Sequence, residues 1–135
     1  RRHKVVHPLA KPGTGVTYEG WIAGQKKIEC LNWEDVYILS SYSEGLPIAF
    51  LEAMAYHHPV ISTPVGGIPE ILKDGYNGRM VQPGDAGGIA KAICDYIEDK
   101  DSIKSQGENS YKVVQPFFPE SVFASLKEIY QELLA

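Results

Sequence analysis

Apolar positions along the chain alternate between short runs and longer stretches with helical spacing. The four consecutive apolar residues at 36–39 lack the alternation of a half-exposed strand and predict a strand that is covered on both faces, as in a parallel sheet. A second buried strand is expected at 59–63, and a third strand at 79–81. A further short β-like run is expected at 16–18, before Gly20.

Between and after these strands, the spacing of apolar residues predicts six helices. They are expected over 25–33, 47–57, 69–73, from Asp85 onward, over 102–114 and over 120–134. Pro47 fits the first position of its helix, because its missing N–H would have no helical partner there. Asp85 is a good N-cap for a helix with a stripe of apolar residues at a period of 3.6. Strands that alternate with helices predict an α/β fold, a Rossmann-like doubly wound parallel sheet.

Composition narrows the class of protein. The 135 residues have 44% apolar side chains and a net charge of −4, which is typical of one globular domain. Scattered lysines and arginines disfavour nucleic acid and a membrane-binding basic patch. No apolar stretch is long enough to span a membrane, and we expect a cytoplasmic domain. Cys30 and Cys94 lie in helical apolar patterns, which predicts buried thiols rather than a disulfide or a zinc site.

Ligands of doubly wound sheets bind beyond the carboxyl ends of the strands, where two loops are expected here, at 40–46 and 64–67. The dinucleotide fingerprint is absent, because the third glycine is missing after Gly13-Thr14-Gly15. The chain also lacks a G-x-x-x-x-G-K phosphate loop and a G-x-S-x-G nucleophile elbow. The loops at the sheet edge therefore become the candidate site.

The first loop ends at a helix start that suits a phosphate. Glu44 precedes the helix, Gly45 lets a ligand approach the backbone closely, and Leu46 and Ile48 offer backbone N–H groups. Glu52 is the only charged residue between Gly45 and Tyr56. Its carboxylate suits the two neighbouring hydroxyls of a ribose, although a pairing with a backbone amide or a lysine is an equal alternative.

The second loop holds Gly66 and Gly67 before a short helix. These glycines fit either a close approach to a ligand or a tight turn with proline at the first helical position. Together, the two loops place two helix N-termini at one crevice, which suits a diphosphate with polar groups on either side.

The two glutamates, separated by seven residues, stand in a longer pattern, S-E-G-L-P-I-A-F-L-E-A-M-A. It is followed by P-V-I-S-T-P-V-G-G-I-P-E-I-L, then D-G-Y-N-G and P-G-D. This order of motifs resembles the E-x7-E region of retaining GT-B glycosyltransferases of family four, also called group one. The resemblance extends from about Val16 to Leu134.

The resemblance implies a nucleotide-diphosphate-sugar donor and transfer of a hexose-type sugar to a polysaccharide or glycolipid acceptor with retention of the anomeric configuration. Glu44 would be the catalytic residue, contacting hydroxyls of the transferred sugar, and Glu52 would bind the ribose diol. The backbone amides around Gly45, Leu46 and Ile48 would hold the diphosphate. The resemblance implies neither a metal nor another cofactor.

The remaining implied contacts come from two glycine-containing segments. The loop that ends at Ile22 would lie near the base of the nucleotide. Gly66 and Gly67 would shape the floor of the site. The sequence departs from the family pattern at His57-His58, where a glycine is usual. We expect His57 to be exposed or to interact with a helix C-terminus, and we do not expect the two histidines to form a metal site.

The resemblance also predicts what the chain lacks. A GT-B enzyme has two Rossmann-like domains, so we expect 1–135 to be one truncated donor-binding domain that is inactive alone. Residues 1–15 would form an irregular or partial first unit, and 120–134 the C-terminal helix. The family's diphosphate-binding cations lie upstream, and Lys26 and Lys27 do not occupy their place. The full-length protein would be cytoplasmic, with a peripheral position at the inner membrane left open.

Two other functions remain open at this point. One is a non-catalytic module that binds a nucleotide sugar, and the other is a fragment of a GT-B epimerase that acts on a nucleotide sugar. The last helix carries a broad apolar stripe, part of which we expect to be uncovered. Such a patch predicts self-association of the chain.

Overall fold

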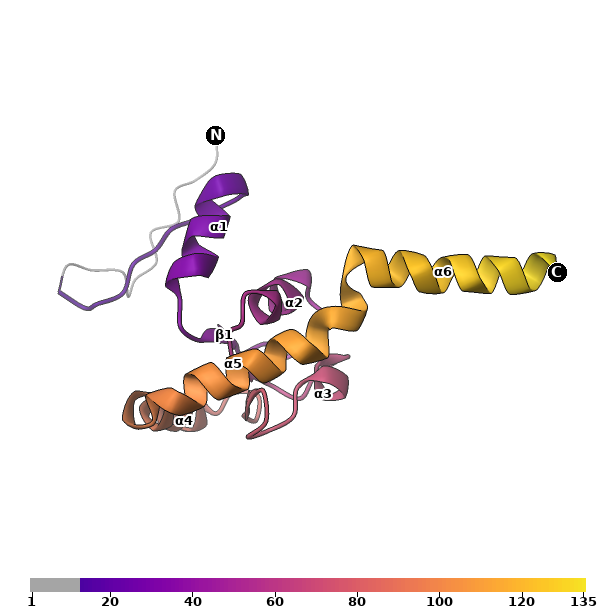
Figure 1. Ribbon diagram of the computed structural model, residues 1–135. Helices are drawn as coiled ribbons and strands as arrows, with labels where there is room; N and C mark the ends of the chain where they lie inside the picture. The colour runs from indigo at the N-terminus through magenta and orange to yellow at the C-terminus, as the bar shows by residue number, and fades with distance from the viewer. Residues whose placement is uncertain (1–12) are drawn as a thin grey trace. The chain divides into compact units, whose positions relative to one another are not determined.

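Figure 1 shows the computed structural model, which describes residues 13–135. The predicted irregular unit at 1–15 lies mostly outside the described residues. The chain divides into two compact units, the first ending at Trp33 and the second spanning Glu34–Ala135. Each unit is described by itself.

The described residues of the first unit form one helix, α1 (Gly24–Trp33), close to the predicted range. The expected β-like run at 16–18 forms no strand, so this prediction is wrong. A strand needs a paired neighbour, and Val16 and Tyr18 are instead exposed. In the same unit, Glu19 pairs with Lys26 and raises the pKa of that ammonium group through a hydrogen bond and charge attraction.

The second unit is built on a parallel sheet, as predicted, and this sheet has three strands. Its strands are β1 (Tyr37–Leu39), β2 (Val60–Ser62) and β3 (Gly78–Met80), in the order β1-β2-β3. Leu39 lies opposite Ser62, and Ser62 lies opposite Met80, so the three strands end at the same edge. That shared edge is where the candidate loops begin.

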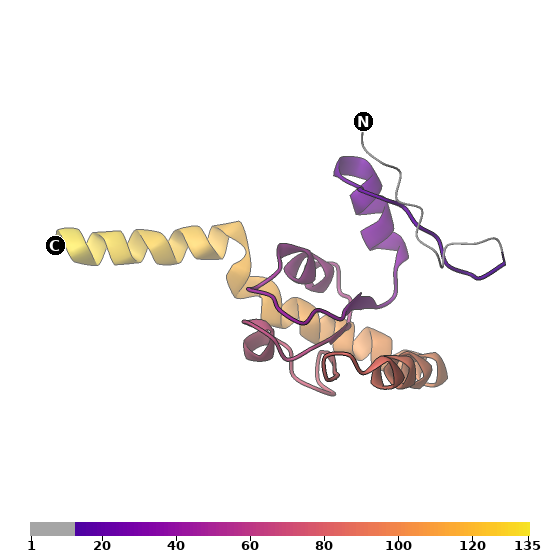
Figure 2. The same cartoon turned by 180° about the vertical axis from the view of Figure 1, so that it is seen from behind.

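Helices follow each strand and continue to the C-terminus (Figures 1 and 2). They are α2 (Ile48–Ala55), α3 (Ile68–Ile71), α4 (Ala86–Glu98), α5 (Lys100–Val114), the 3-10 turn η1 (Gln115–Phe117) and α6 (Pro119–Leu134). All of the predicted helices are therefore present, with ends shifted by no more than two residues.

The central strand separates two hydrophobic clusters, because successive residues of a strand point to opposite faces. Val60 packs with Phe50 and Met54 of α2, in a cluster that also includes α3 and Val114 of α5. Ile61, the next residue, packs on the other face with residues of α4. Every residue of β2 is buried, as predicted. The prediction that 36–39 is covered on both faces is wrong, because β1 is at the edge of this sheet and its Ile38 is 41% exposed. Helices thus cover both faces, and the doubly wound α/β prediction is confirmed.

In helix α4 the predicted Asp85 N-cap is confirmed, whereas the predicted burial of Cys94 is wrong. The Asp85 carboxylate accepts a hydrogen bond from the Gly88 N–H at 2.8 Å. Cys94, in contrast, is exposed, and Cys30 is partly buried. Cys94 is two positions from both Ala92 and Tyr96, which are buried, so the helical rotation places it on the outer face. Both thiols are free.

Helix α6 has no buried residue. Its predicted apolar stripe is exposed at Val122, Phe123, Leu126, Ile129, Tyr130, Leu133 and Leu134. None of the helices within residues 13–135 combines the length and apolar character that crossing a membrane requires.

Candidate functional site

The two candidate loops, 40–46 after β1 and 64–67 after β2, lie side by side at the carboxyl edge of the sheet. Two hydrogen bonds connect them. The Thr63 hydroxyl donates to the Ser41 carbonyl oxygen at 2.6 Å, and the Gly67 N–H donates to the Gly45 carbonyl oxygen at 2.8 Å. The structure therefore brings Gly45 and Gly67, which the sequence assigned to one site, into direct contact.

Gly66 lies where the loops approach most closely. Its φ of +56° is strained for a side chain, and a Cβ there would overlap the carbonyl oxygens of Glu44 and Gly45. The glycine is thus required by its contact with the neighbouring loop. At Gly67, a Cβ would lie 3.5 Å from the Leu46 Cβ, which is an ordinary van der Waals contact.

The N-terminus of α2 begins immediately after the first loop. Pro47 is the N-cap, with extended backbone, so the prediction that it occupies the first helical position is wrong. Its carbonyl oxygen accepts hydrogen bonds from the Phe50 and Leu51 N–H groups at 3.1 and 3.3 Å. A proline side chain has no acceptor, and no side chain caps this helix start. Its first-turn N–H groups and positive dipole end can therefore face an anion.

The two glutamates of the predicted site lie on neighbouring parts of this region. Glu44 is half-buried in the loop, and its Oε1 accepts a hydrogen bond from the Ser41 hydroxyl at 2.6 Å. Glu52 is half-buried on α2, with its Oε2 buried. Burial, followed by the negative charges of Glu34, Glu44 and Glu52, raises the pKa of Tyr37. Glu44 and Glu52 therefore share one electrostatic environment beside β1.

The other predicted site residues occupy different surroundings. Leu46 packs partly buried against the core, whereas the Ile48 side chain is 73% exposed. Only their backbone N–H groups were assigned to the site, and both lie at the start of α2. Ile22 belongs to the first unit, before α1, and its assignment to the base of the nucleotide stays a prediction.

Sequence reasoning missed Ser41 and Thr63. The Ser41 hydroxyl donates a hydrogen bond to the Glu44 carboxylate, and the hydroxyl of Thr63, which is fully buried, donates to the Ser41 carbonyl oxygen. The spacing of Ser41 and Glu44 is a weak local signal, because serine often bonds to nearby residues in loops. The bond from Thr63 spans 22 positions and has no local sequence signal.

The adjacent histidines point to different partners. His57 is exposed, as expected; it stacks on Tyr111 with ring centroids 4.1 Å apart and has its Nδ1 3.3 Å from Glu108 Oε1. His58 is buried, with its Nε2 3.6 Å from Glu34 Oε1. Burial raises the pKa of Glu34, and His58 opposes this shift. Among residues 13–135, no cluster of three or more His, Cys, Asp or Glu side chains could hold a metal ion.

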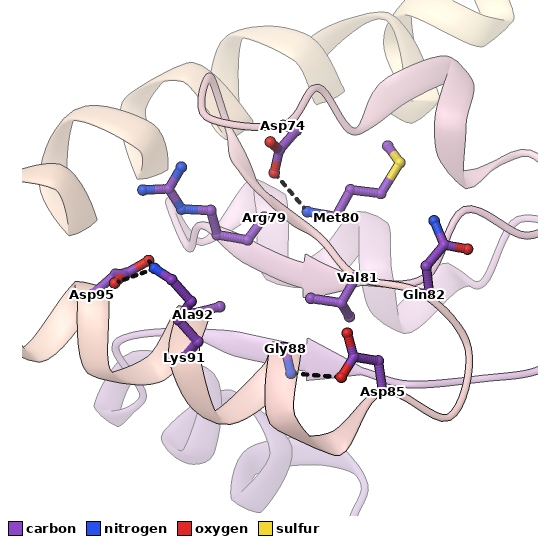
Figure 3. Close-up of a pocket in the computed structure, with 10 residues that line it drawn as sticks. All are labelled: Asp74, Arg79, Met80, Val81, Gln82, Asp85, Gly88, Lys91, Ala92 and Asp95. Atoms are coloured by element: carbon purple, nitrogen blue, oxygen red, sulfur yellow. Dashed lines mark hydrogen bonds and ion pairs between the residues drawn. The ribbon is translucent and has the colours of Figure 1, made fainter.

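A separate pocket of about 350 Å³ lies between β3 and α4 (Figure 3). Its charged groups are largely engaged with neighbours: Asp74 Oδ1 accepts from the Met80 N–H, and Lys91 pairs with Asp95 at 2.9 Å. The Arg79 guanidinium lies 5.9 Å from the centre of the Tyr96 ring. None of the predicted site residues lines this pocket.

The fold and the loop geometry define an α/β protein with a candidate anion site at the carboxyl edge of a parallel sheet. The family model of the glycosyl transferases group 1 matches residues 10–113. The chain therefore belongs to the group 1 glycosyltransferases, and the family resemblance found in the motifs is confirmed.

Individual relatives agree with this assignment. The N-acetyl-alpha-D-glucosaminyl L-malate synthase of Bacillus anthracis is 33% identical over 78% of this chain and 28% of its own length. The sucrose-phosphate synthase structure from Thermosynechococcus elongatus matches with a TM-score of 0.80 and 29% identity, over 90% of this chain and 31% of that one.

A third match is the structure of the C-terminal domain of a glycosyl transferase group 1 family protein, LpcC, from Francisella tularensis. It has a TM-score of 0.63 and 33% identity, over 70% of this chain and 49% of that one. The chain thus spans less than a third of the length of the first curated relatives that it matches, at 27% and 28%.

Proposed function

We propose that this chain is the donor-binding domain of a retaining glycosyltransferase. The donor would be a nucleotide-diphosphate sugar, and the acceptor a polysaccharide or glycolipid. The observation that carries this proposal is the uncapped N-terminus of α2, which follows a loop that is hydrogen-bonded to its neighbour and lies between Glu44 and Glu52.

The N-terminus of α2 would bind the diphosphate. Backbone N–H groups at Gly45, Leu46 and Ile48 are the assigned donors, and the positive end of the helix dipole favours the negative charge. As the bond between the sugar and the diphosphate breaks, negative charge grows on the leaving diphosphate. Fixed amide dipoles at this position would stabilise that charge without having to reorganise.

Glu52 and Glu44 would recognise the two ends of the donor. The Glu52 carboxylate is assigned to the ribose diol, since its two oxygens can accept two hydrogen bonds side by side. Glu44 is assigned to hydroxyls of the transferred sugar. Gly66 and Gly67 would set the floor of this site, because their contact with the first loop fixes the backbone around Glu44 and Gly45.

Transfer would need a second domain that binds the acceptor. Two facts support this part of the proposal: the chain spans under a third of its first curated relatives, and it matches a structure described as a C-terminal domain. The bond from the anomeric carbon to the diphosphate oxygen would break, and a bond to an acceptor hydroxyl oxygen would form on the same face of the sugar. The proton of that hydroxyl would leave with the diphosphate. The isolated chain would then bind donor without transferring it, and the longer protein would act in the cytoplasm.

A calorimetric screen of the chain with UDP, GDP, ADP, UDP-glucose, GDP-mannose and ADP-glucose tests the proposal. We expect at least one nucleoside diphosphate to bind, with an affinity weaker than that of the longer protein. Glu52→Ala should weaken that binding by about 1–3 kcal/mol, the range for leaving hydrogen-bond partners unsatisfied.

The control is Glu98→Ala, which removes an exposed carboxylate at the end of α4 and should leave binding unchanged. Failure of all six ligands to bind below millimolar concentration would refute the donor-site assignment. Equal effects of the two substitutions would refute the ribose role of Glu52.

A further inference from the structure

The Glu44 carboxylate is held by a hydrogen bond from within its own loop. The Ser41 Oγ lies 2.6 Å from Glu44 Oε1, and both residues are half-buried. A hydroxyl donor to an ionised carboxylate makes one of the stronger hydrogen bonds in proteins. Because Oε1 accepts this bond, the direction in which Oε2 points is also restricted, and Oε2 keeps its own capacity to accept from a ligand.

Ser41 is itself fixed from the neighbouring strand. The Thr63 hydroxyl donates to the Ser41 carbonyl oxygen at 2.6 Å, and Thr63 has no exposed surface. One position earlier, the Ser62 hydroxyl donates to the Leu39 carbonyl oxygen at 2.9 Å. Ser62, the last residue of β2, and Thr63, which follows it, thus both donate side-chain hydrogen bonds to the segment 39–41, where β1 ends and the first loop begins.

The backbone of Glu44 is restricted by a third contact. Gly66 packs directly against the Glu44 carbonyl, so closely that no side chain would fit between them. The next N–H, that of Gly67, donates to the Gly45 carbonyl oxygen at 2.8 Å. The second loop therefore restricts the main chain at the Glu44 and Gly45 carbonyls, and the bond from Ser41 restricts the Glu44 side chain.

We propose that Ser41 is a positioning residue for Glu44, and that Thr63 is the buried anchor that sets the position of Ser41. This inference rests on the proposed function, in which Glu44 contacts the transferred sugar. The bond from Ser41 selects the carboxylate orientation that meets a sugar hydroxyl, and the bond from Thr63 keeps Ser41 within reach of Glu44. This orientation of the Glu44 carboxylate affects binding of the sugar and leaves the diphosphate contacts at α2 unchanged.

The test compares binding of a nucleoside diphosphate with binding of the matching nucleotide sugar, using UDP with UDP-glucose, GDP with GDP-mannose and ADP with ADP-glucose. Ser41→Ala should lower the affinity for the nucleotide sugar by about tenfold. The affinity for the free nucleoside diphosphate should change by less than about twofold, because it has no sugar for Glu44 to contact. Ser41→Thr, which keeps a hydroxyl, should restore sugar recognition.

The matched control is Ser43→Ala, which removes the hydroxyl of an exposed serine in the same loop. An unchanged ratio of the two affinities in Ser41→Ala would overturn the inference. An equal loss for both ligands would also overturn it, because a general disturbance of the loop affects both alike.

The role of Thr63 is tested by Thr63→Val, which removes the hydroxyl and keeps the shape, with Thr63→Ser as the conservative variant. Thr63→Val, like Ser41→Ala, should lower the affinity for the nucleotide sugar more than the affinity for the nucleoside diphosphate. When both substitutions are combined, the loss should be no larger than with Ser41→Ala alone, because both act through Glu44. Independent, multiplied losses would refute the role of Thr63 as the anchor.

Crystal structures of the chain and of Ser41→Ala separate this inference from the proposed function. We expect one orientation of the Glu44 carboxylate in the parent chain and several in the variant. If no nucleotide sugar binds but the orientation depends on Ser41, the proposed function fails and the positioning of Glu44 stands. If donor binds and the orientation is the same in both structures, the positioning inference fails and the proposed function stands.

Discussion

The N-termini of α2 and α4 both follow the carboxyl end of a strand, yet they are built differently. At α4, the Asp85 carboxylate accepts a hydrogen bond from the Gly88 N–H at 2.8 Å. At α2, the N-cap is Pro47, and no side chain caps the helix. A capping carboxylate satisfies the helix from within the chain, whereas an uncapped start leaves N–H groups for solvent or a ligand. The comparison separates a helix start built for folding from one suited to an anion.

The largest effect should come from disturbing the loops beside α2. Gly66→Ala places a Cβ against the carbonyl oxygens of Glu44 and Gly45, at a φ of +56°. We expect a loss of about 3 kcal/mol in the free energy of unfolding, measured with urea, together with loss of nucleoside diphosphate binding. Gly67→Ala is the control, because its Cβ would have ordinary contacts, and it should cost less than about 1 kcal/mol. Equal stability of the two variants would contradict the close approach at Gly66.

The second prediction concerns the core beneath α4. Tyr96 is 2% exposed, and its hydroxyl donates to Gln106 Oε1 at 2.6 Å. Burial raises the pKa of Tyr96 to about 12, with Arg79 opposing and Asp74 reinforcing the shift. The pKa is therefore higher in the folded chain than in the unfolded chain, where the phenol titrates near pH 10. The stabilisation is complete below pH 10 and is lost as the pH rises through about 12.

We expect the free energy of unfolding to fall by about 2 kcal/mol between pH 10 and 12, the effect of a shift of this size. Urea denaturation at a series of pH values measures the change. Tyr96→Phe should flatten the decline, because the titrating group is removed. A decline of the same steepness in the variant would assign the effect to other residues.

The third prediction removes the cap of α4. Asp85→Ala should lower the free energy of unfolding by about 1 kcal/mol. Asp85→Asn should retain most of the stability of the parent chain, because an asparagine side chain can also cap a helix. Neither change should alter nucleoside diphosphate binding, because this helix start is satisfied within the chain. Weaker binding in Asp85→Ala would show that the two helix starts are not functionally distinct.

The smallest effect should come from giving α2 the cap that α4 has. The backbone of Pro47, with φ −67° and ψ 128°, is extended and suits an aspartate N-cap. Pro47→Asp should change the free energy of unfolding by no more than about 1 kcal/mol, and it should weaken nucleoside diphosphate binding through repulsion and competition for the N–H groups. Pro47→Ala separates loss of the proline ring from gain of the carboxylate. Undiminished binding in Pro47→Asp would argue against the diphosphate position.

Local patterns were sufficient to predict the helices, the three strands of the sheet and the sheet edge where the candidate loops meet. The runs around β1, β2 and β3 indicated parallel strands, and Asp85 marked the start of α4 correctly. The expected burial of both faces was right for β2 and wrong for β1, where Ile38 is 41% exposed. The run at 16–18 was misleading, because β-like residues form a strand only beside a partner. Cys94 was also misjudged, since an apolar pattern alone does not reveal which side of a helix faces the core.

Several details of the site depend on contacts between distant residues. The bond from Thr63 to Ser41 and the approach of Gly66 to Glu44 join segments that are 22 positions apart. The preference of proline for a helix start did not distinguish the N-cap from the first helical position at Pro47. These contacts and the position of the N-cap depend on how the two loops pack at the edge of the sheet, which local sequence does not reveal.

The sequence by itself determined the order of strands and helices, the family, and the glutamates and glycines of the candidate site, because hydrophobic periodicity and motif spacing are local properties of the chain. The tertiary structure decided that Ser41 and Thr63 belong with Glu44, and that α2 begins without a side-chain cap. It could do so because parallel strands bring together loops that are remote in sequence, and hydrogen bonds across that edge form only after the strands have paired.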